Sequence, residues 1–225
     1  MAYIVMPLIF MIMGYGIVAL IFSPHFDTIY AAGNLLIVDD RSIIAQGIEL
    51  RSVFDEDAAY ITAAAIDDYN TLHISDIDMP NYGDHYAELR NRRIGLAAPV
   101  FLGDDYEILR YGVGHYFGSW LPGFGGTILL SGHNYLHFHP LQHFEIDDIV
   151  QLQTNYGLYE YLVVDIDIFT VSAAEEMLDL GQMEQEILLL YTCYPFDAIQ
   201  VPEYRIFIFA EKISGPVIDF MAQEY

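Results

Sequence analysis

The residue best suited to covalent chemistry in this 225-residue chain is its single cysteine, Cys193. The thiol follows an apolar run at residues 187–190 and precedes a Tyr-Pro pair, a pattern typical of a buried strand that ends at a turn. A second strand is predicted at residues 204–211, with Arg205 as the charged residue in its apolar opening. A thiol and a guanidinium so placed could serve as a nucleophile and as a stabiliser of developing negative charge. The structural alternative is a buried cysteine and an arginine whose stem lies along apolar surface.

Several short motifs upstream of Cys193 follow one another in a recognisable order. They are RNRRIGLAAPV at residues 90–100, GVGHY at 112–116, LSGHN at 130–134, FHPL at 138–141 and TCYPF at 192–196. No single motif is specific, but together they resemble the sortases, and most closely the class D sortases. The resemblance covers roughly residues 86–213, the extent of a whole sortase catalytic domain.

The resemblance implies a fold, a catalytic set and a reaction. The fold is a closed eight-stranded β-barrel with a few short helices, and the catalytic residues are His133, Cys193 and Arg205. The thiolate cleaves the peptide bond that follows the threonine in a C-terminal sorting signal of the Leu-Pro-x-Thr type. His133 protonates the departing amine. Arg205 faces the oxyanion or the substrate backbone, and the acyl group then passes to an amine of peptidoglycan or of another surface protein. His115 is interpreted as structural or groove-lining, and Leu189 stands where family members commonly carry threonine.

The pattern of short apolar stretches and turns predicts a mainly β fold. Strands are expected at residues 86–90, 98–102, 127–131, 149–153 and 159–169, in addition to the two strands around Cys193. Ser172 with Glu175 three residues later forms a capping box, which predicts a helix over residues 173–180. Short helical turns are expected at residues 104–110 and from His139. Many short strands with few helices indicate a closed barrel.

The first part of the chain predicts an attachment to the membrane. Residues 3–22 are uncharged and overwhelmingly apolar, which is long enough to span a bilayer. The alternatives are a cleaved signal peptide or a buried core helix, but no A-x-A cleavage pattern follows the run. We therefore expect an uncleaved anchor at residues 1–22, an extracytoplasmic tether at 23–84 and the catalytic domain at 85–225. The tether is expected to pack in part on the catalytic domain and to contain a helix at residues 58–69. No Lys or Arg precedes Arg41, so the distribution of positive charge does not indicate the orientation of the anchor. The resemblance implies a single-pass protein of the cell membrane with its catalytic domain outside the cytoplasm.

Composition excludes some classes of partner. With 32 acidic and 8 basic residues, the chain lacks the clustered positive charge that nucleic acids require. A lone cysteine excludes an intramolecular disulfide. Four histidines lie between His133 and His143, but no second cysteine and no H-E-x-x-H arrangement accompanies them, so we predict neither a metal nor another cofactor.

Two other functions remain open at this point. One is a thiol peptidase that only hydrolyses its substrate, although a papain-like enzyme would place the cysteine before the histidine in the chain, and here His133 precedes Cys193. The other is an inactive binding module with the sortase fold. The presence of all three candidate catalytic residues argues against this second alternative.

Overall fold

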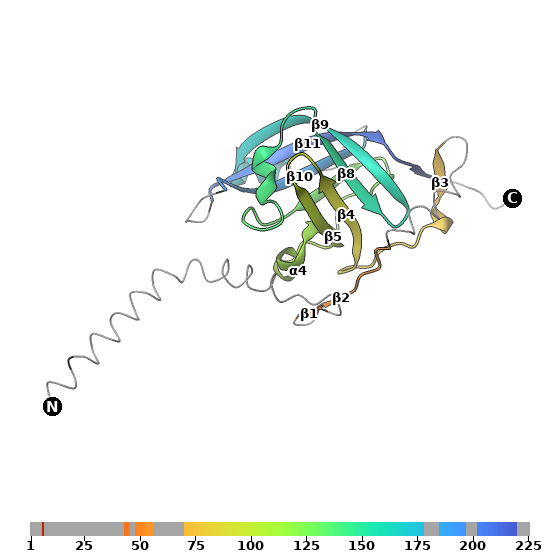
Figure 1. Ribbon diagram of the computed structural model, residues 1–225, viewed down its shortest axis with the longest axis horizontal. Helices are drawn as coiled ribbons and strands as arrows, with labels where there is room; N and C mark the ends of the chain where they lie inside the picture. The colour runs from red at the N-terminus through yellow and green to blue at the C-terminus, as the bar shows by residue number, and fades with distance from the viewer. Residues whose placement is uncertain are drawn as a thin grey trace.

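The computed structural model describes Met6 and residues 43–45, 48–55, 70–177, 185–196 and 202–219. The described part is built around a closed barrel of eight strands in the order β10-β11-β9-β8-β4-β5-β6-β7 (Figure 1). The mainly β, closed eight-stranded fold expected from the sequence is therefore confirmed. The predicted anchor at residues 3–22 and the predicted helix at 58–69 lie outside the described residues, apart from Met6. Among the residues that are described, no helix is long and apolar enough to cross a membrane.

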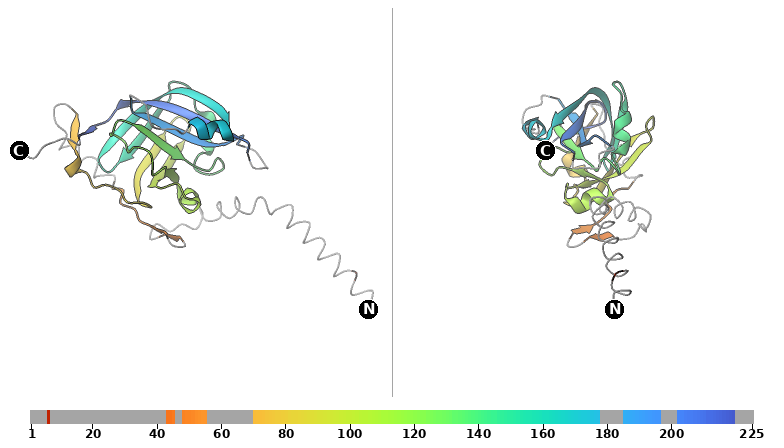
Figure 2. Two further views of the ribbon diagram at one scale, coloured as in Figure 1. Left: turned by 180° about the vertical axis from the view of Figure 1, so that it is seen from behind. Right: turned by 90° about the vertical axis from the view of Figure 1, so that its left-hand side faces the viewer.

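The barrel strands follow one another with short helices between them. Their bounds are β4 His85–Asn91, β5 Leu96–Leu102, β6 Val113–His115, β7 Thr127–Ser131, β8 Ile149–Thr154, β9 Gly157–Thr170, β10 Ile187–Tyr194 and β11 Tyr204–Ser214. Four shorter strands lie outside the barrel: β1 Ile43–Ala45, β2 Ile48–Leu50, β3 Thr71–His73 and β12 Val217–Asp219. Between residues 70 and 177 the structure has the helices α4 Tyr106–Tyr111 and α5 Val171–Met177, with the 3-10 turns η2 Ile74–Asp76 and η3 His139–His143. Figure 2 shows the barrel from behind and from one end, with β3 beyond one end of it.

The thiol lies at the end of its strand as the sequence indicated, because β10 runs through Tyr194 and Cys193 is its second-last residue. One detail differs from the sequence-based expectation. The helix after β9 begins at Val171, and Ala173 N donates to Thr170 Oγ1 at 3.4 Å. The prediction that Ser172 caps this helix was therefore wrong. Because β9 runs directly into α5 without a loop, the last residue of the strand occupies the capping position.

The interior of the barrel forms one continuous apolar core that includes three large aromatic side chains. Tyr86, Tyr159 and Tyr161 are each no more than 1% exposed and come from β4 and β9, which both pair with β8. Leu188 and Leu190 of β10 point into the same core, so the alternate residues Leu189, Tyr191 and Cys193 lie on the outer face. The pleat of β10 thus directs the thiol to the outside of the barrel.

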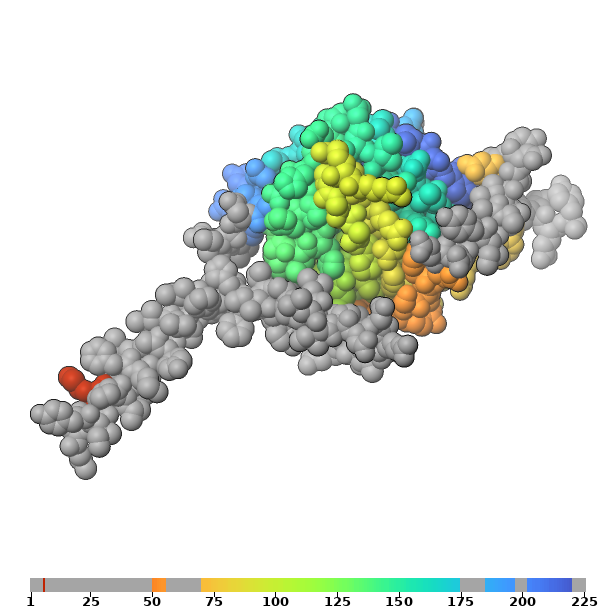
Figure 3. All heavy atoms as spheres, viewed as in Figure 1, coloured from red at the N-terminus to blue at the C-terminus, as the bar shows by residue number. Residues whose placement is uncertain are grey.

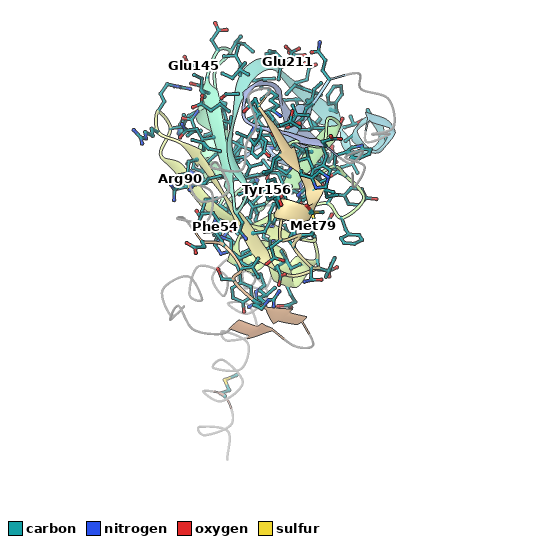
Figure 4. All side chains as sticks on the ribbon, turned by 90° about the vertical axis from the view of Figure 1, so that its right-hand side faces the viewer. Phe54, Met79, Arg90, Glu145, Tyr156 and Glu211 are labelled. Carbon is teal, nitrogen blue, oxygen red and sulfur yellow. The ribbon has the colours of Figure 1, made fainter. Side chains whose placement is uncertain are left out.

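Part of the segment expected to be a tether packs against the barrel. Residues 50–55, which we call the N-terminal strap, lie along the start of β4, where His85 N donates to Arg51 O and Val53 N donates to His85 O. Arg51 also donates to both carboxylate oxygens of Asp84, at 3.2 and 3.0 Å. In Figure 3 the strap is the orange surface directly beside the yellow surface of the barrel. Figure 4 views the barrel from the β3 end, with Phe54 of the strap and Glu211 of β11 on opposite sides.

Candidate active site

Strand β10 carries the thiol between two neighbouring strands. On one side β11 runs antiparallel to it, and its register places Arg205 directly opposite Cys193. Directly opposed residues on neighbouring strands point to the same face, with Cβ atoms about 4.5–5.5 Å apart. The structure thus brings together the thiol and the guanidinium that the sequence singled out, on the outer face of the barrel.

On the other side, β7 runs parallel to β10 and ends just before the candidate histidine. Its last residue, Ser131, is paired with Tyr191, which lies two residues before Cys193. His133 lies two residues after Ser131, so the two segments leave the sheet side by side, with the histidine and the thiol at matching positions. The three candidate residues therefore share one end of three adjacent strands.

Two hydrogen bonds hold the histidine and cysteine segments together, and sequence reasoning had not found either. Thr192 Oγ1 donates to Gly132 O at 2.6 Å, one residue before each candidate catalytic residue. Asn134 Nδ2 donates to Pro195 O at 3.1 Å, just beyond them. Both Thr192 and Asn134 are buried, at 2% and 7% exposure. Because the two bonds flank His133 and Cys193, they restrict how far the imidazole and the thiol can separate.

The His133 ring lies between two tyrosines. It stacks on Tyr135 with ring centroids 5.0 Å apart and meets Tyr106 of α4 edge-on at 5.9 Å. Its Nε2 atom is buried and has no hydrogen-bond partner among the described residues. Burial lowers the pKa of His133 because the apolar surroundings disfavour the charged ring. The site therefore holds a neutral imidazole with a free nitrogen, the form that can accept a proton.

Arg205 is held by the backbone at the start of its strand. Its Nη1 donates to Pro202 O at 3.0 Å and to Tyr204 O at 2.9 Å. Among the described residues no carboxylate forms an ion pair with it. A guanidinium carries five N–H donors, so donors remain for an oxyanion or a substrate carbonyl near Cys193.

An apolar cluster lies on the outer face beside the thiol. Its buried members are Leu129, Ala174, Leu189 and Phe207, with Phe169, Tyr191 and Phe209 packed against them. They come from β7, β10, β11, β9 and α5, so the helix covers one side of the cluster. Leu189, which stands at the family's common threonine position, is 2% exposed and packs well here. The four buried members have almost no exposed surface, whereas the half-buried aromatic members leave apolar surface on the outer face near Cys193.

His115 has structural surroundings and His139 lies at the surface, whereas His137 has a buried Nε2 without a hydrogen-bond partner among the described residues. His115 is fully buried, its Nδ1 contacts the Tyr86 hydroxyl and its Nε2 contacts Ser119 Oγ at 2.8 Å. Burial lowers the pKa of His115 to about 3. His139 lies against Phe196 at the surface, with ring centroids 6.3 Å apart. Within the described residues no group of three or more His, Cys, Asp or Glu side chains is placed to hold a metal ion.

The closed barrel carries a cysteine, a histidine and an arginine at one end of three adjacent strands, and comparison with known proteins gives its class. The sortase domain family model matches residues 89–213. Sortase D of Bacillus subtilis (strain 168) is 32% identical over 135 residues, which cover 60% of this chain and 67% of that protein. The chain therefore belongs to the sortase family and is a sortase-type transpeptidase.

Solved structures agree with this assignment. A Sortase D5 transpeptidase of Clostridium perfringens is similar in fold, with a TM-score of 0.53 and 20% identity, over 60% of this chain and 83% of that one. Sortase C-1 of Actinomyces oris is similar with a TM-score of 0.51 and 26% identity, over 58% of this chain and 74% of that one. The similarity thus extends to sortases of more than one class.

Proposed function

We propose that this protein is a membrane-anchored cysteine transpeptidase that cleaves a sorting signal of the Leu-Pro-x-Thr type through a thioester on Cys193. The acyl group then passes to an amine of the cell wall or of another protein. The observation that supports this proposal is the direct pairing of Cys193 with Arg205, with His133 on the adjacent parallel segment. No metal or other cofactor is needed for this chemistry.

The first half-reaction forms the thioester. The Cys193 sulfur attacks the backbone carbonyl carbon of the threonine in the signal. The thiol proton passes to the free nitrogen of His133. Arg205 donates hydrogen bonds to the oxyanion that develops. As the C–N bond breaks, His133 gives its proton to the departing amine. The proton therefore travels from the thiol to the leaving group, and the histidine returns to its neutral form.

The second half-reaction decides between transfer and hydrolysis. An incoming amine attacks the thioester carbonyl and gives its proton to His133. The C–S bond breaks as the new amide forms, and His133 returns the proton to the sulfur of Cys193. Water could follow the same route, which gives the alternative function of a thiol peptidase. Transpeptidation requires the amine to reach the thioester faster than water does.

The donor side of the proposal is supported by the apolar cluster beside Cys193. The half-buried side chains of Phe169, Tyr191 and Phe209 pack against the buried members of this cluster and leave part of their apolar surface exposed on the outer face. A leucine and a proline that precede the scissile bond can bury their side chains there and gain about 25 cal/mol per Å² of apolar surface covered. The uncharged apolar run at residues 3–22 supports the proposed single-pass anchor, with the catalytic domain outside the cytoplasm.

Mass spectrometry of the full chain in detergent tests the proposal. The protein is mixed with a Leu-Pro-x-Thr-Gly peptide, with and without an added amine, and Cys193→Ala is run in parallel. We expect an acyl adduct on Cys193 and an amine-dependent ligated product, and neither product with the variant. Hydrolysed peptide without ligated product would favour the peptidase. Normal product formation by Cys193→Ala, or no adduct across a panel of sorting peptides, would overturn the proposal in favour of a non-catalytic module.

A further inference from the structure

Asp104 lies at the edge of the candidate active site but has no role in the chemistry proposed above. It follows β5 and precedes α4. A Cβ atom added at Gly114 of β6 would lie 2.9 Å from the Asp104 Cα and 2.8 Å from a side-chain carbon of Leu109. The segment that carries Asp104 therefore rests directly on the outer face of β6, and only glycine fits beneath it.

The sheet register places this contact beside the reacting residues. Gly114 is paired with Ser131 of β7, and Ser131 is paired with Tyr191 of β10. Paired residues point to the same face, so Asp104, Ser131 and Tyr191 lie across one outer row of the barrel. Tyr191 is two residues from Cys193, which is about 7 Å along a strand. Asp104 is thus on the β6 side of the site, whereas Arg205 is on the β11 side.

The electrostatics agree with this placement. Burial raises the pKa of Tyr191, and the Asp104 carboxylate raises it further, while Arg205 lowers it and Cys193 raises it. The Tyr191 hydroxyl therefore lies within electrostatic reach of both the carboxylate and the reacting thiol. The Ser131 hydroxyl in the same row is buried and makes no hydrogen bond of standard geometry, although it lies close enough to Tyr191 to affect its pKa.

Asp104 has no cationic partner among the described residues. Arg110, the basic residue of the adjacent helix, pairs with Glu107 at 3.0 Å. Arg205 donates to backbone carbonyls, and Lys212 pairs with Glu186 at the start of β10. Partial burial and the neighbouring Asp105 raise the pKa of Asp104, because no positive charge offsets the cost of removing the carboxylate from water. A partly buried carboxylate without a cationic partner is stabilised when a ligand brings a positive charge next to it.

We infer that Asp104 forms a subsite for a cationic group of a substrate, either an ammonium or a guanidinium group, carried by the acyl donor or by the amine acceptor. The inference rests on the proposed function and specifies its substrate class. The Tyr106 ring is 51% exposed and contacts His133, so it lies at the same edge of the site and offers an aromatic face to such a cation. A substrate with a positive charge on the β6 side and a carbonyl oxygen on the β11 side would meet Asp104 and Arg205 respectively.

Substrate competition tests the subsite and separates donor from acceptor. Donor peptides with lysine or methionine at the variable position, and acceptors with one or two amino groups, are compared by kcat/KM for the wild type and Asp104→Asn. We expect a preference of about two- to fivefold for the cationic member of one series. Asp104→Asn abolishes this preference and Asp104→Glu keeps it. Asp167→Asn, which removes one exposed carboxylate from the opposite wall, is the matched control and also keeps it. The series that shows the preference identifies the source of the cation, whereas equal preference in the wild type and Asp104→Asn would overturn the subsite.

A second measurement does not depend on transpeptidation. Methanethiosulfonates form a mixed disulfide with the Cys193 thiolate and expel methanesulfinate, so the modification rate reports the field at the thiol. We expect the ratio of the rate with a trimethylammonium reagent to the rate with a neutral methyl reagent to fall about two- to fivefold in Asp104→Asn. In Asp167→Asn, which has the same net charge, the ratio stays close to that of the wild type. An equal fall in both variants would show a general charge effect and refute the subsite. If no sorting peptide gives product but the ratio of modification rates falls in Asp104→Asn as expected, the proposed function is refuted and the cation subsite is retained.

Discussion

Strand β10 joins two regions of the barrel that differ in how their carboxylates and histidines are partnered. At its end lies Cys193, and directly before its first residue lies Glu186. The Glu186 carboxylate is 7% exposed and accepts hydrogen bonds from Gly123 N, Gly125 N and the Tyr161 hydroxyl, the last at 2.7 Å. Lys212 completes the set with an ion pair of 3.3 Å. This Glu186 network also borders a hollow of about 430 Å³ near Asn70 and Val217.

At the other end, an imidazole nitrogen, a hydroxyl and a carboxylate are left without partners within the described residues, although Thr192 and Asn134 are hydrogen-bonded. His133 Nε2 and Ser131 Oγ are buried without hydrogen bonds of standard geometry, and Asp104 has no cation among the described residues. The hydroxyls of Thr127, Tyr156 and Tyr159, near the Glu186 end, are also buried without partners in the described part of the chain, so the contrast concerns the carboxylates and the histidine. Leaving such a group unpaired costs stability. From this difference we infer that the Glu186 network stabilises the barrel, whereas the Cys193 end binds a ligand and reacts.

The sharpest way to test this contrast is to change one residue at each end. Cys193→Ala is expected to reduce product formation roughly 10³-fold or more, because the nucleophile is lost, with little change in the free energy of unfolding. Glu186→Ala is expected to lower the free energy of unfolding by about 3–5 kcal/mol, since Lys212 is left partly buried without its partner. Urea denaturation and peptide cleavage, measured on both variants, give the two results.

Glu211→Ala is the control for the second variant, because Glu211 is exposed on the strand that carries Lys212. It should change stability by no more than about 0.5 kcal/mol. A Glu186→Ala protein as stable as this control would contradict the stabilising role of the Glu186 network.

His115 extends the contrast to the two histidines in family-like motifs, since its ring is fully partnered and that of His133 is not. Its pKa is about 3 in the folded protein and near 6.5 when unfolded. Between these values the unfolded chain binds a proton that the folded chain does not, so stability falls as pH falls below 6.5. The contribution approaches about 1.4 kcal/mol per pH unit. We expect His115→Asn, although less stable overall, to have a shallower loss of unfolding free energy between pH 6.5 and 5 than the exposed-site control His139→Asn. Equal slopes in the two variants would show that His115 is not responsible.

Much of the fold could be predicted because its strands carry their own pattern. The apolar strand Thr127–Ser131 and the hairpin of β8 and β9 lie where alternation and turn residues placed them. The cap of α5 and the position of the N-terminal strap could not be found in this way. A cap depends on where the preceding strand ends, and the strap bonds to Asp84, 33 residues away. Local patterns carry no information on such contacts.

In the candidate site, too, residues within local motifs could be predicted and residues that depend on long-range contacts could not. His133, Cys193 and Arg205 are visible in the sequence because each belongs to a recognisable motif. Thr192 and Asn134 act through bonds that join positions 60 and 61 residues apart, so their partners appear only when β7 and β10 pair. Asp104 gives no sequence signal, because its importance follows from the glycine beneath it on another strand.

The hydrogen bonds that flank the reacting pair test whether the Cys193 end is also held in place. Thr192→Val keeps the shape of the buried side chain but removes the bond to Gly132 O. We expect a loss of about 1–2 kcal/mol in unfolding free energy, because the carbonyl is left unpaired. We also expect roughly a tenfold fall in kcat with KM changed less, because the histidine and cysteine segments separate. Thr192→Ser, which restores the hydroxyl, should recover most of kcat, and a variant with normal kcat and reduced stability would assign the bond to folding alone.

The smallest effect comes from Asp84, a carboxylate that contrasts with Asp104 because it has its partners. Arg51 and the backbone N–H of Asn81 bind Asp84 and lower its pKa, although burial opposes them. A lowered carboxyl pKa stabilises the fold above the unfolded value near 3.9, and this stabilisation is lost as pH falls through the folded value. Since the Arg51 side chain is 59% exposed, we expect Arg51→Gln to cost no more than about 1 kcal/mol at pH 7. The difference between wild type and variant, measured by urea denaturation from pH 7 to pH 3, should shrink in the acid range. A difference that is constant with pH would mean that the N-terminal strap is held by its backbone bonds to His85 and not by this ion pair.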